Sequence, residues 1–233
     1  MNIICIIPAR GGSKGIPKKN LIDFCGKPLL AWSILQATES KLAKDVYVSS
    51  DSDEILSVAK AYGAKTIKRP DEVSTDTSTS ESALLHTIDQ IEIDFSDKID
   101  LVVFLQATSP LRESKDIDGS IEKIIKDKAD SLFSSALLED YFIFEEKEGS
   151  FESVNFDYKN RSRRQDAKPQ YLENGSIYIF KPWVLRDNDN RLGGNISTYE
   201  MEHWKSFEID TMGDLELCEW YMKRTFLDSV SVK

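Results

Sequence analysis

The fold is decided by the stretch IICIIPARGGSKGIPKKN, residues 3–20. Its first five residues are apolar, which is typical of a strand buried on both faces in the middle of a parallel sheet. In the loop that follows, the cations Arg10, Lys14 and Lys19 stand beside three glycines. Glycine lets the backbone approach an anion closely, and open α/β sheets bind ligands beyond the carboxyl ends of their strands. The stretch therefore predicts a phosphate site at the end of a central strand, and its three cations suit a triphosphate.

The cation-rich loop differs from two widespread phosphate-binding motifs. It has neither the P-loop, in which Gly-Lys-Ser/Thr follows four intervening residues, nor the Gly-x-Gly-x-x-Gly of dinucleotide-binding folds. Kinases and dehydrogenases are therefore disfavoured. One cation about 4 Å from a phosphate contributes on the order of 4 kcal/mol at an effective dielectric of 20, before desolvation is subtracted. A solvated loop without a ligand explains less well why the cations directly follow a buried strand.

Outward from this loop, short β-branched runs alternate with amphipathic helical patterns. This order is typical of a parallel sheet flanked by helices, so we assign the chain to the α/β class. The strands are expected at 3–7, 45–49, 101–105, 131–135 and 176–180. The helices are expected at 55–62 with Gly63 as the end signal, from the capping-box pattern STSE at 78–81 through Ile91, at 117–125 and at 215–222.

The pattern changes after residue 138. Alternating residues at 141–145 and 151–158, on either side of Lys147-Glu148-Gly149, predict a β-hairpin. The hairpin leads into KNRSRR, residues 159–164, the dense cationic cluster of an otherwise acidic chain. We therefore divide the chain into a nucleotide-binding part at 1–138, an inserted β-rich segment at 139–170 and the remainder of the α/β domain at 171–233.

Composition and charge exclude several classes of protein. The chain has 233 residues, 40% of them apolar and 30% charged, which is enough for a substantial core. The 30 basic and 40 acidic residues give 30 − 40 = −10, a charge that opposes binding to nucleic acids and to anionic membrane surfaces. No run approaches the roughly 20 apolar residues of a membrane span. The N-terminus has no basic region before its strand-like run, and the three scattered cysteines indicate reduced thiols, so we expect a cytoplasmic protein.

Five segments carry a resemblance to a known family. In chain order they are PARGGSKGIPKKN (8–20), KRPDEVSTDTSTSESALLH (68–86), LQATSPLR (105–112), ENGSIYIF (173–180) and FEIDTMGDL (207–215). In content and order they resemble the CMP-sialic acid synthetases, or acylneuraminate cytidylyltransferases, over nearly the whole chain. The resemblance implies a Rossmann-like nucleotidyltransferase fold. It also implies an enzyme that joins CTP to a nine-carbon 2-keto sugar acid and releases pyrophosphate, with Mg²⁺ as the cofactor.

The resemblance assigns nucleotide-binding roles by position. For one of these positions, Ser80, a role without any ligand is equally possible, because a serine at this place can belong to a loop or a helix cap. The matching positions are Arg10, Lys14 and Lys19 for the triphosphate, with Arg10 and Lys19 also catalytic, Asn20 near the ribose and α-phosphate, and Arg69 and Ser80 for the cytosine and its ribose.

Two further positions resemble the family's contacts with the sugar acid. Gln106 follows the buried strand at 101–105, again at a carboxyl end. Asn174 matches a sugar-contacting asparagine, although Asn-Gly is also an ordinary turn signal. The nearby Arg112 can be interpreted simply as a surface ion-pair partner.

A pair of carboxylates matches the metal site of the family. In the alternating Glu208-Ile209-Asp210, an extended strand puts both carboxylates on one side, which suits Mg²⁺ shared with phosphates. The family usually has aspartate at both positions, so we expect Asp210 to bind directly and the longer Glu208 to bind through water. A solvated strand edge is the alternative. Magnesium would stabilise charge at the α-phosphate and orient the attacking sugar hydroxyl.

The inserted segment resembles the family's dimerisation element, which lends basic side chains to the partner's site. Arg164 and Gln165 match that pattern best, and arginine suits a carboxylate-bearing substrate. We therefore expect a homodimer. The stretch EDYFI at 139–143 departs from the family's histidine- and proline-containing segment. Its aromatic, apolar character favours a 6-deoxy, di-N-acylated sugar such as legionaminic acid over sialic acid.

Two other functions remain open at this point. One is another sugar nucleotidyltransferase, such as the enzyme that activates the eight-carbon sugar acid of lipopolysaccharide. The other is a protein that binds a nucleotide or sugar without turning it over. The presence of Lys19 and Asp210 argues against the second alternative.

Overall fold

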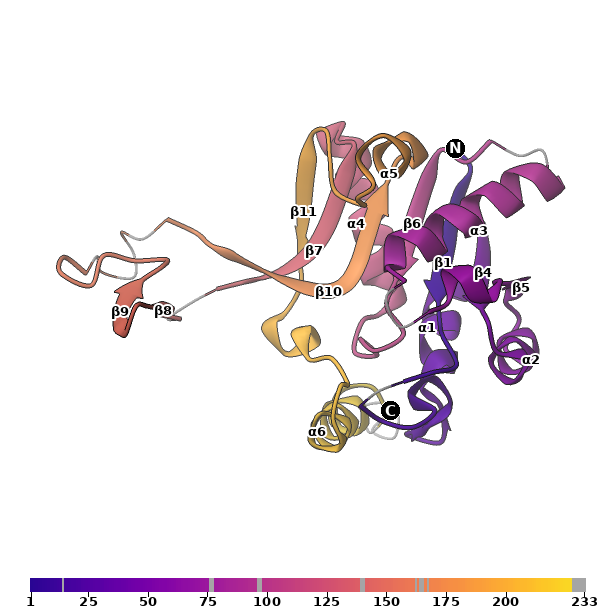
Figure 1. The fold of residues 1–233 in the computed structure, drawn as a ribbon, viewed down its shortest axis with the longest axis horizontal. Coiled ribbons are helices and arrows are strands. Elements are labelled where there is room, and N and C mark those ends of the chain that lie inside the picture. Colours follow the sequence, from indigo (N-terminus) through magenta and orange to yellow (C-terminus); the bar gives the residue numbers. More distant parts are fainter. Residues whose placement is uncertain are drawn as a thin grey trace.

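The computed structural model of the chain describes residues 1–13, 15–75, 78–95, 98–138, 141–161, 163, 166 and 168–227. Its main sheet contains β1 (Ile3–Pro8), β4 (Asp45–Ser50), β5 (Lys65–Lys68), β6 (Leu101–Leu105), β7 (Ser131–Leu137), β10 (Tyr171–Phe180) and β11 (Ile196–Glu200). These seven strands lie in the order β11-β7-β10-β6-β1-β4-β5 (Figure 1). β10 is antiparallel to its neighbours β6 and β7, and the other neighbouring pairs are parallel. The predicted α/β class, with a mostly parallel sheet, is confirmed.

Helices cover both faces of the sheet. They are α1 (Leu29–Thr38), α2 (Asp53–Ala61), α3 (Ser80–Phe95), α4 (Ser114–Asp127), α5 (Pro182–Asn188) and α6 (Met212–Met222). Because side chains alternate along a strand, β1 directs Cys5 and Ile7 toward α1, α2 and α4, and Ile4 and Ile6 toward α3 and α5. This double burial explains why β1 is apolar throughout. In the described part of the chain, no helix is long and apolar enough to cross a membrane.

The predicted helix at 55–62 is present as α2, which begins two residues earlier, at Asp53, and the start of α3 differs from the prediction by one residue. The Ser52 hydroxyl caps α2, and Gly63 ends the turn after it with a φ of +91°. For α3 the capping-box pattern predicts Ser78 as the cap. Instead the Thr79 hydroxyl accepts the Ser82 N–H at 3.2 Å, and the helix begins at Ser80. Ser78 is unavailable as the cap because its hydroxyl accepts the Thr75 N–H at 2.9 Å and closes the preceding turn.

Several elements are not predicted by the sequence patterns. β5 and β11 are short strands at the two edges of the sheet and are only partly buried, so they lack a continuous apolar run. α1 is buried on most sides and shows no polar face that would reveal a helical period. β10 starts at Tyr171, five residues before the predicted strand at 176–180. The sequence pattern misses this first part because it is exposed and because the register shifts between Glu173 and Tyr178.

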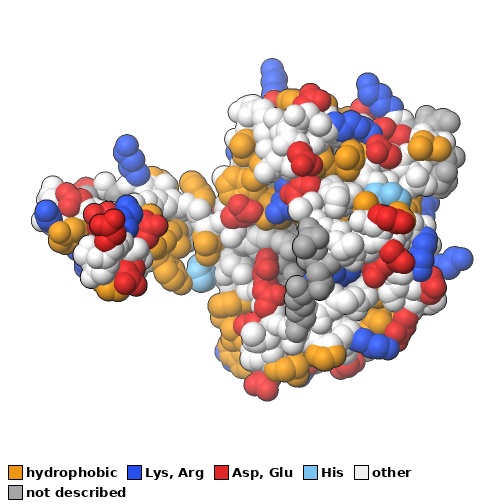
Figure 2. All heavy atoms as spheres, in the orientation of Figure 1, with side chains coloured by type: hydrophobic (Ala, Val, Ile, Leu, Met, Phe, Trp, Pro, Cys, Tyr) orange, Lys and Arg blue, Asp and Glu red, His pale blue; other side chains and the backbone are white. Residues whose placement is uncertain are grey.

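An arm, which we define as residues 141–161, lies apart from the sheet (Figure 1). It contains β8 (Phe144–Lys147) and β9 (Ser150–Ser153), which are shorter than the predicted strands. Glu148 and Gly149 both have positive φ, as a two-residue hairpin turn requires. Within the arm, Phe142 and Phe156 pack with ring centroids 4.8 Å apart. Figure 2 shows hydrophobic side chains on the arm and along the narrow stretch that joins it to the body.

The three cysteines are free thiols, and Cys5 and Cys218 are buried. Burial raises the pKa of each of these two thiols to about 12. A thiol with such a pKa stays protonated at neutral pH and is a poor nucleophile. The interpretation of these two cysteines as packing residues therefore agrees with their surroundings.

Candidate active site

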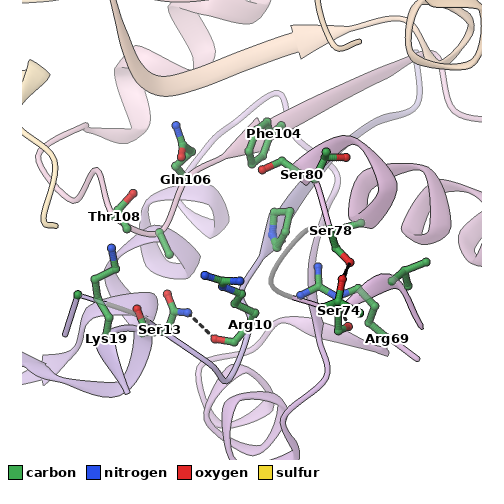
Figure 3. A pocket seen from close by; sticks show the side chains of 18 of the residues that line it. Arg10, Ser13, Lys19, Arg69, Ser74, Ser78, Ser80, Phe104, Gln106 and Thr108 are labelled. Atoms are coloured by element: carbon green, nitrogen blue, oxygen red, sulfur yellow. Dashed lines mark hydrogen bonds between the residues drawn. The ribbon is translucent and has the colours of Figure 1, made fainter. Parts of the chain in front are cut away.

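A cavity of about 580 Å³ lies beyond the carboxyl ends of β1, β5 and β6. Its walls come from the loop after β1, from the segment between Arg69 and Ala83, and from the end of β6 (Figure 3). Among the predicted residues, those that line it are Arg10, Lys19, Asn20, Arg69, Ser80, Gln106 and Asp210. Four segments that are far apart in the sequence, including the one that carries Asp210, are thus brought together where an α/β sheet places its ligands.

The loop after β1 folds back on itself at the cavity. The Asn20 amide donates to the Arg10 carbonyl at 3.0 Å, and residues 19–21 form a single turn of 3₁₀ helix. Lys19 Nζ lies 2.8 Å from the Asp210 carboxylate, which is 69% exposed. Figure 3 shows Arg10 between Lys19 on one side and Arg69 on the other. The cations therefore approach the cavity from several sides. Lys14 lies outside the described residues.

Gly15 allows the loop to approach Asp210. A Cβ atom at position 15 would lie 2.6 Å from the Asp210 carbonyl oxygen, so any side chain would push the loop away from this residue. The same glycine lines the cavity. The glycines of this loop predicted a close backbone approach. At Gly15 the approach is to the segment that carries Asp210, the predicted metal ligand.

Arg69 and the start of α3 form the opposite wall. Arg69 is 5% exposed, and its Nε donates to the Ser74 hydroxyl at 2.9 Å. Burial is the main cause that lowers the pKa of its guanidinium. Because Thr79 provides the cap, Ser80 is the first residue of α3 and not its cap residue. Ser80 lines the cavity beside Ser78.

Gln106 and Gly175 connect the cavity to β10. The Gln106 side-chain amide lines the cavity and donates to the Gly175 carbonyl at 2.7 Å. Gly175 has a φ of +65°, and a Cβ there would collide with the Glu208 carboxylate at 1.7 Å and with Gln106 Nε2 at 2.7 Å. The Asn-Gly pair is therefore not an ordinary turn. Its glycine makes room for two predicted site residues inside a long strand.

Asn174 lies beneath the site and does not line the cavity. It is 3% exposed, and its carbonyl oxygen accepts the Ser134 hydroxyl at 2.6 Å and the Ser176 N–H at 3.2 Å. Its amide nitrogen contacts the Met201 sulfur. In this structure the side chain ties β10 to β7. The predicted sugar contact of Asn174 has no support from this arrangement.

Arg112 is not on the surface, so its interpretation as a surface ion-pair partner is wrong. It is 1% exposed and donates to the carbonyl oxygens of Gln106 and Ser109, each at 2.6 Å. Burial lowers its pKa to about 10, so it remains charged at neutral pH. Its guanidinium also contacts Ser33 and Ser176. Arg112 therefore fixes the loop that carries Gln106. A lone arginine in a sequence gives no sign of such a role.

Glu208 and Asp210 do not lie in a regular strand, contrary to the prediction. Their segment connects a 3₁₀ turn to α6 and is held by the Ile209 N–H, which donates to the Thr108 carbonyl at 2.8 Å. Ile209 is fully buried, whereas Asp210 is exposed at the cavity. Glu208 is half-buried, and the Ser109 hydroxyl donates to its carboxylate at 3.3 Å. Burial, and then the neighbouring Asp210, raise the pKa of Glu208.

The described residues hold no cluster of three or more His, Cys, Asp or Glu side chains suited to a metal ion. Asp210 and Glu208 therefore supply too few donors for an all-protein cage. Magnesium, however, commonly takes one or two carboxylates together with substrate phosphates and water. The donor set fits that mode, because Asp210 faces the same cavity as Lys19 and Arg10.

The cavity also contains polar groups that the sequence patterns did not single out. Its wall includes a series of hydroxyl side chains and the ring of Phe104 (Figure 3). A signal was present in the hydroxyl-rich segments STDTSTS at 74–80 and ATSP at 107–110. The additional hydroxyl residues are Ser13, Ser74, Thr75, Ser78, Thr79 and Thr108. The predicted residues Arg164 and Gln165 of the inserted segment lie outside the described residues.

The chain is similar to known proteins over almost its whole length. The family model described as "Cytidylyltransferase" matches residues 4–228. N-acylneuraminate cytidylyltransferase A of Danio rerio is 38% identical over 221 residues, which are 94% of this chain and 50% of that protein. Pseudaminic acid cytidylyltransferase of Campylobacter jejuni strain 81-176 is 35% identical over 226 residues, 94% of this chain and 95% of that protein. The chain thus spans about half of the zebrafish relative and nearly all of the Campylobacter one.

A solved structure supports the fold. CMP:2-keto-3-deoxy-manno-octonic acid synthetase, solved in complex with CTP, superimposes with a TM-score of 0.72 over 96% of this chain and 99% of that chain. The two sequences are 18% identical, so this likeness concerns the fold alone. It agrees with the Rossmann-like arrangement that the resemblance implies.

Proposed function

This chain belongs to the cytidylyltransferase family, and from that premise we propose that it transfers CMP from CTP to a nonulosonic acid and releases pyrophosphate. The relatives named above act on N-acylneuraminate and on pseudaminic acid, both nine-carbon sugar acids, and their identity to this chain extends over almost all of it. The proposed substrates are therefore CTP and a sugar acid of this class. We also propose that the protein is cytoplasmic.

The observation that carries this proposal is the ion pair between Lys19 and Asp210 at the edge of a cation-lined cavity. The two residues are 191 positions apart in the chain, yet their side chains meet at 2.8 Å. A triphosphate can replace Asp210 as the partner of Lys19, which places the cation on the phosphates and leaves the carboxylate for a second role. Arg10 and Arg69 contribute further positive charge to the same cavity.

The proposed chemistry is a single displacement at the α-phosphorus. The anomeric hydroxyl oxygen of the sugar forms a bond to that phosphorus, the bond to the oxygen bridging the α- and β-phosphates breaks, and the hydroxyl proton passes to solvent. Negative charge develops on the departing pyrophosphate, and the preorganised cations Arg10 and Lys19 stabilise it. Asn20 is suited to orient the nucleotide, because its hydrogen bond to Arg10 fixes it in the loop. No nucleophile from the protein is required.

Magnesium is part of the proposal. Asp210 would hold it directly and Glu208 through water, and it would neutralise phosphate charge and polarise the reacting phosphate. The residues of the chain do the rest: Lys19 and Arg10 orient the phosphates, and Gly15 lets the loop reach the Asp210 segment. The pKa of Glu208 is raised first by burial and then by the neighbouring Asp210, as expected for two carboxylates that lie close together.

The sugar acid is proposed to bind on the Gln106 side of the cavity. The Gln106 side-chain amide donates to the Gly175 carbonyl, and Arg112 donates to the Gln106 backbone carbonyl, so the residue is preorganised. A carboxylate-bearing sugar needs a cation as well, and we assign that role to Arg164, with Gln165 beside it, from a partner subunit. Lys14 is assigned to the triphosphate. These three assignments rest on the resemblance alone.

A substrate panel tests the proposed function. We expect pyrophosphate release only when CTP, a nine-carbon sugar acid and Mg²⁺ are all present, and a higher kcat/KM with legionaminic acid than with sialic acid. The preference rests on the aromatic and apolar character of Tyr141, Phe142 and Ile143. These side chains are about half-exposed and do not line the cavity of their own chain, so they would meet the sugar from a partner subunit.

Each alternative has its own outcome in this panel. Faster release with an eight-carbon sugar acid would favour the lipopolysaccharide-type enzyme. CTP binding without release with any sugar acid would favour a non-catalytic binding protein. A higher kcat/KM with sialic acid would reject the legionaminic preference while leaving the cytidylyltransferase activity intact.

We also propose that two copies of the chain assemble through the arm. The support is the apolar surface of the arm, including Phe151, which is 68% exposed. Single exposed side chains are ordinary, but a projecting hairpin with several of them is typical of an interface. Sedimentation equilibrium is expected to give twice the mass of the chain, and Phe151→Glu is expected to raise the dissociation constant. Ile93→Glu, at a residue 70% exposed on α3, is the control. A monomeric wild-type protein would contradict this assembly.

A further inference from the structure

Asp51 is a carboxylate that the proposed chemistry does not use, although it lies directly behind the cation-lined cavity. It follows β4, and its side chain is 24% exposed. One of its oxygens, Oδ1, accepts the Gly11 N–H at 2.9 Å and lies 4.0 Å from a terminal nitrogen of Arg69. A single oxygen atom thus contacts both the loop after β1 and the arginine after β5.

The backbone around Asp51 joins the same two segments. The Ala9 N–H donates to the Ser49 carbonyl at 2.9 Å, and the Arg69 N–H donates to the Ser50 carbonyl at 2.8 Å. The Asp51 side chain adds the next contacts to the same two segments. A Cβ on Gly11 would lie 3.1 Å from the Ser52 Cβ, so the loop is packed closely against this strand end.

The charges of the site explain why an acidic residue is useful there. Burial lowers the pKa of Arg69, the Asp51 carboxylate opposes this shift, and the nearby Arg10 guanidinium adds to it. Arg10 and Arg69 therefore repel each other across the cavity wall. Both arginines line the cavity, whereas Asp51 and Gly11 do not. A carboxylate in this position attracts Arg69 without meeting a bound polyphosphate.

We propose that Asp51 is a positioning residue that fixes the loop carrying Arg10 and the side chain of Arg69 relative to each other, and so couples the polyphosphate end of the nucleotide site to its base end. The inference rests on the proposed function, because it assigns CTP to this cavity. It predicts that Asp51 acts on CTP affinity and not on the sugar.

The test is calorimetric binding of CTP, with steady-state kinetics and melting temperatures for the same variants. Asp51→Ala is expected to raise the Kd for CTP about tenfold, as for the loss of a hydrogen bond to a charged group. Asp51→Asn keeps an oxygen for the Gly11 N–H and is expected to raise the Kd only about threefold. The KM for CTP is expected to rise and the KM for the sugar acid to stay unchanged. Asp53→Asn is the control, because Asp53 is 88% exposed and pairs with Lys68.

A double-mutant cycle tests the link to Arg69. A full additional tenfold loss when Asp51→Ala is combined with Arg69→Lys would show that Asp51 acts independently of Arg69 and would overturn the proposal.

The remaining outcomes also decide the question. Unchanged CTP affinity with a lowered melting temperature would make Asp51 a purely structural residue, and tighter CTP binding in both Asp51 variants would make it only a repelling charge. Either result would overturn the role of Asp51 but not the proposed function, because the wild-type chain would still turn over its substrates. A wild-type chain that binds no CTP would overturn the proposed function and this inference together.

Discussion

Lys19→Ala is expected to lower kcat by about 100- to 1,000-fold, the usual cost of removing one preorganised group that stabilises transition-state charge. The loss is expected in kcat and kcat/KM together, because the charge acts mainly on the phosphates as the bond breaks. Folding is expected to change little. The ion pair of Lys19 with the exposed Asp210 contributes at most about 1 kcal/mol, and Lys19 lies in a short turn outside the main core.

The neighbouring Lys18 gives a matched control. Its side chain is 68% exposed and pairs with Glu54 on the far side of the loop, away from the cavity. Lys18→Ala is expected to change kcat less than about threefold, within the range of substitutions that remove only a surface ion pair. If both variants lost rate equally, or if the rate loss of Lys19→Ala matched a large fall in melting temperature, Lys19 would not have the assigned role.

The second large effect concerns stability and arises at Lys205. This lysine lies in the 3₁₀ turn His203–Ser206, and its side chain is 0% exposed. Its ammonium donates to Glu113 at 2.7 Å and to Asp116 at 2.8 Å, and Glu202 lies 3.0 Å away. Burial by itself lowers the pKa of Lys205, but the bonds to Asp116 and Glu113 outweigh it and raise the pKa. The cluster ties the C-terminal part of the chain to the start of α4.

Lys205→Met is expected to lower the free energy of unfolding by about 3 to 5 kcal/mol, since it leaves buried carboxylates without their cation. Asp116, whose side chain is 3% exposed, is the group affected most. Urea unfolding at pH 7 measures the change. Lys115→Met is the control, because Lys115 also pairs with Glu113 but is 64% exposed, and its loss is expected to cost less than about 1 kcal/mol. Equal effects of the two substitutions would contradict this account of the cluster.

The cost of Lys205→Met is expected to depend on pH. Burial raises the pKa values of Glu113 and Glu202, but hydrogen bonds from lysine, including Lys205, outweigh it and lower both. Their contribution to stability is present above the ordinary pKa and is lost as the pH falls through the folded value. The contribution of Lys205, whose pKa is raised, is lost only at high pH. The gap between wild type and variant is therefore expected to be largest between about pH 5 and pH 10, and to shrink below about pH 4.

The sequence predicts the central part of the fold better than its edges. The strand at 3–7 and the strand at 101–105 are recognisable because both faces of each are buried and leave a continuous apolar run. β11 and β5, at the sheet edges, have mixed surroundings and lack such a run. The start of α3 depends on which hydroxyl caps it, and Ser78 is already engaged in a turn that the capping pattern does not reveal.

The site shows a similar division. Charged loop residues such as Lys19 are predictable, because cations beside glycines directly after a buried strand are typical of a phosphate-binding loop. The pairing of Lys19 with Asp210 is not predictable from local pattern, since it depends on the whole chain between them. The burial of Arg112 is not predictable either, because two of its partners, Ser33 and Ser176, come from distant segments. The role proposed for Asp51 becomes visible only when β4 and β5 are placed side by side.

The most direct measurement of the central claim is the mass of the product that the wild-type chain forms from CTP and a nonulosonic acid in the presence of Mg²⁺. We expect a compound with the mass of the sugar acid plus CMP minus one water, formed in equal amount with pyrophosphate and only when both substrates are present. A folded chain that binds CTP but yields no such compound with any nine-carbon sugar acid would contradict this claim.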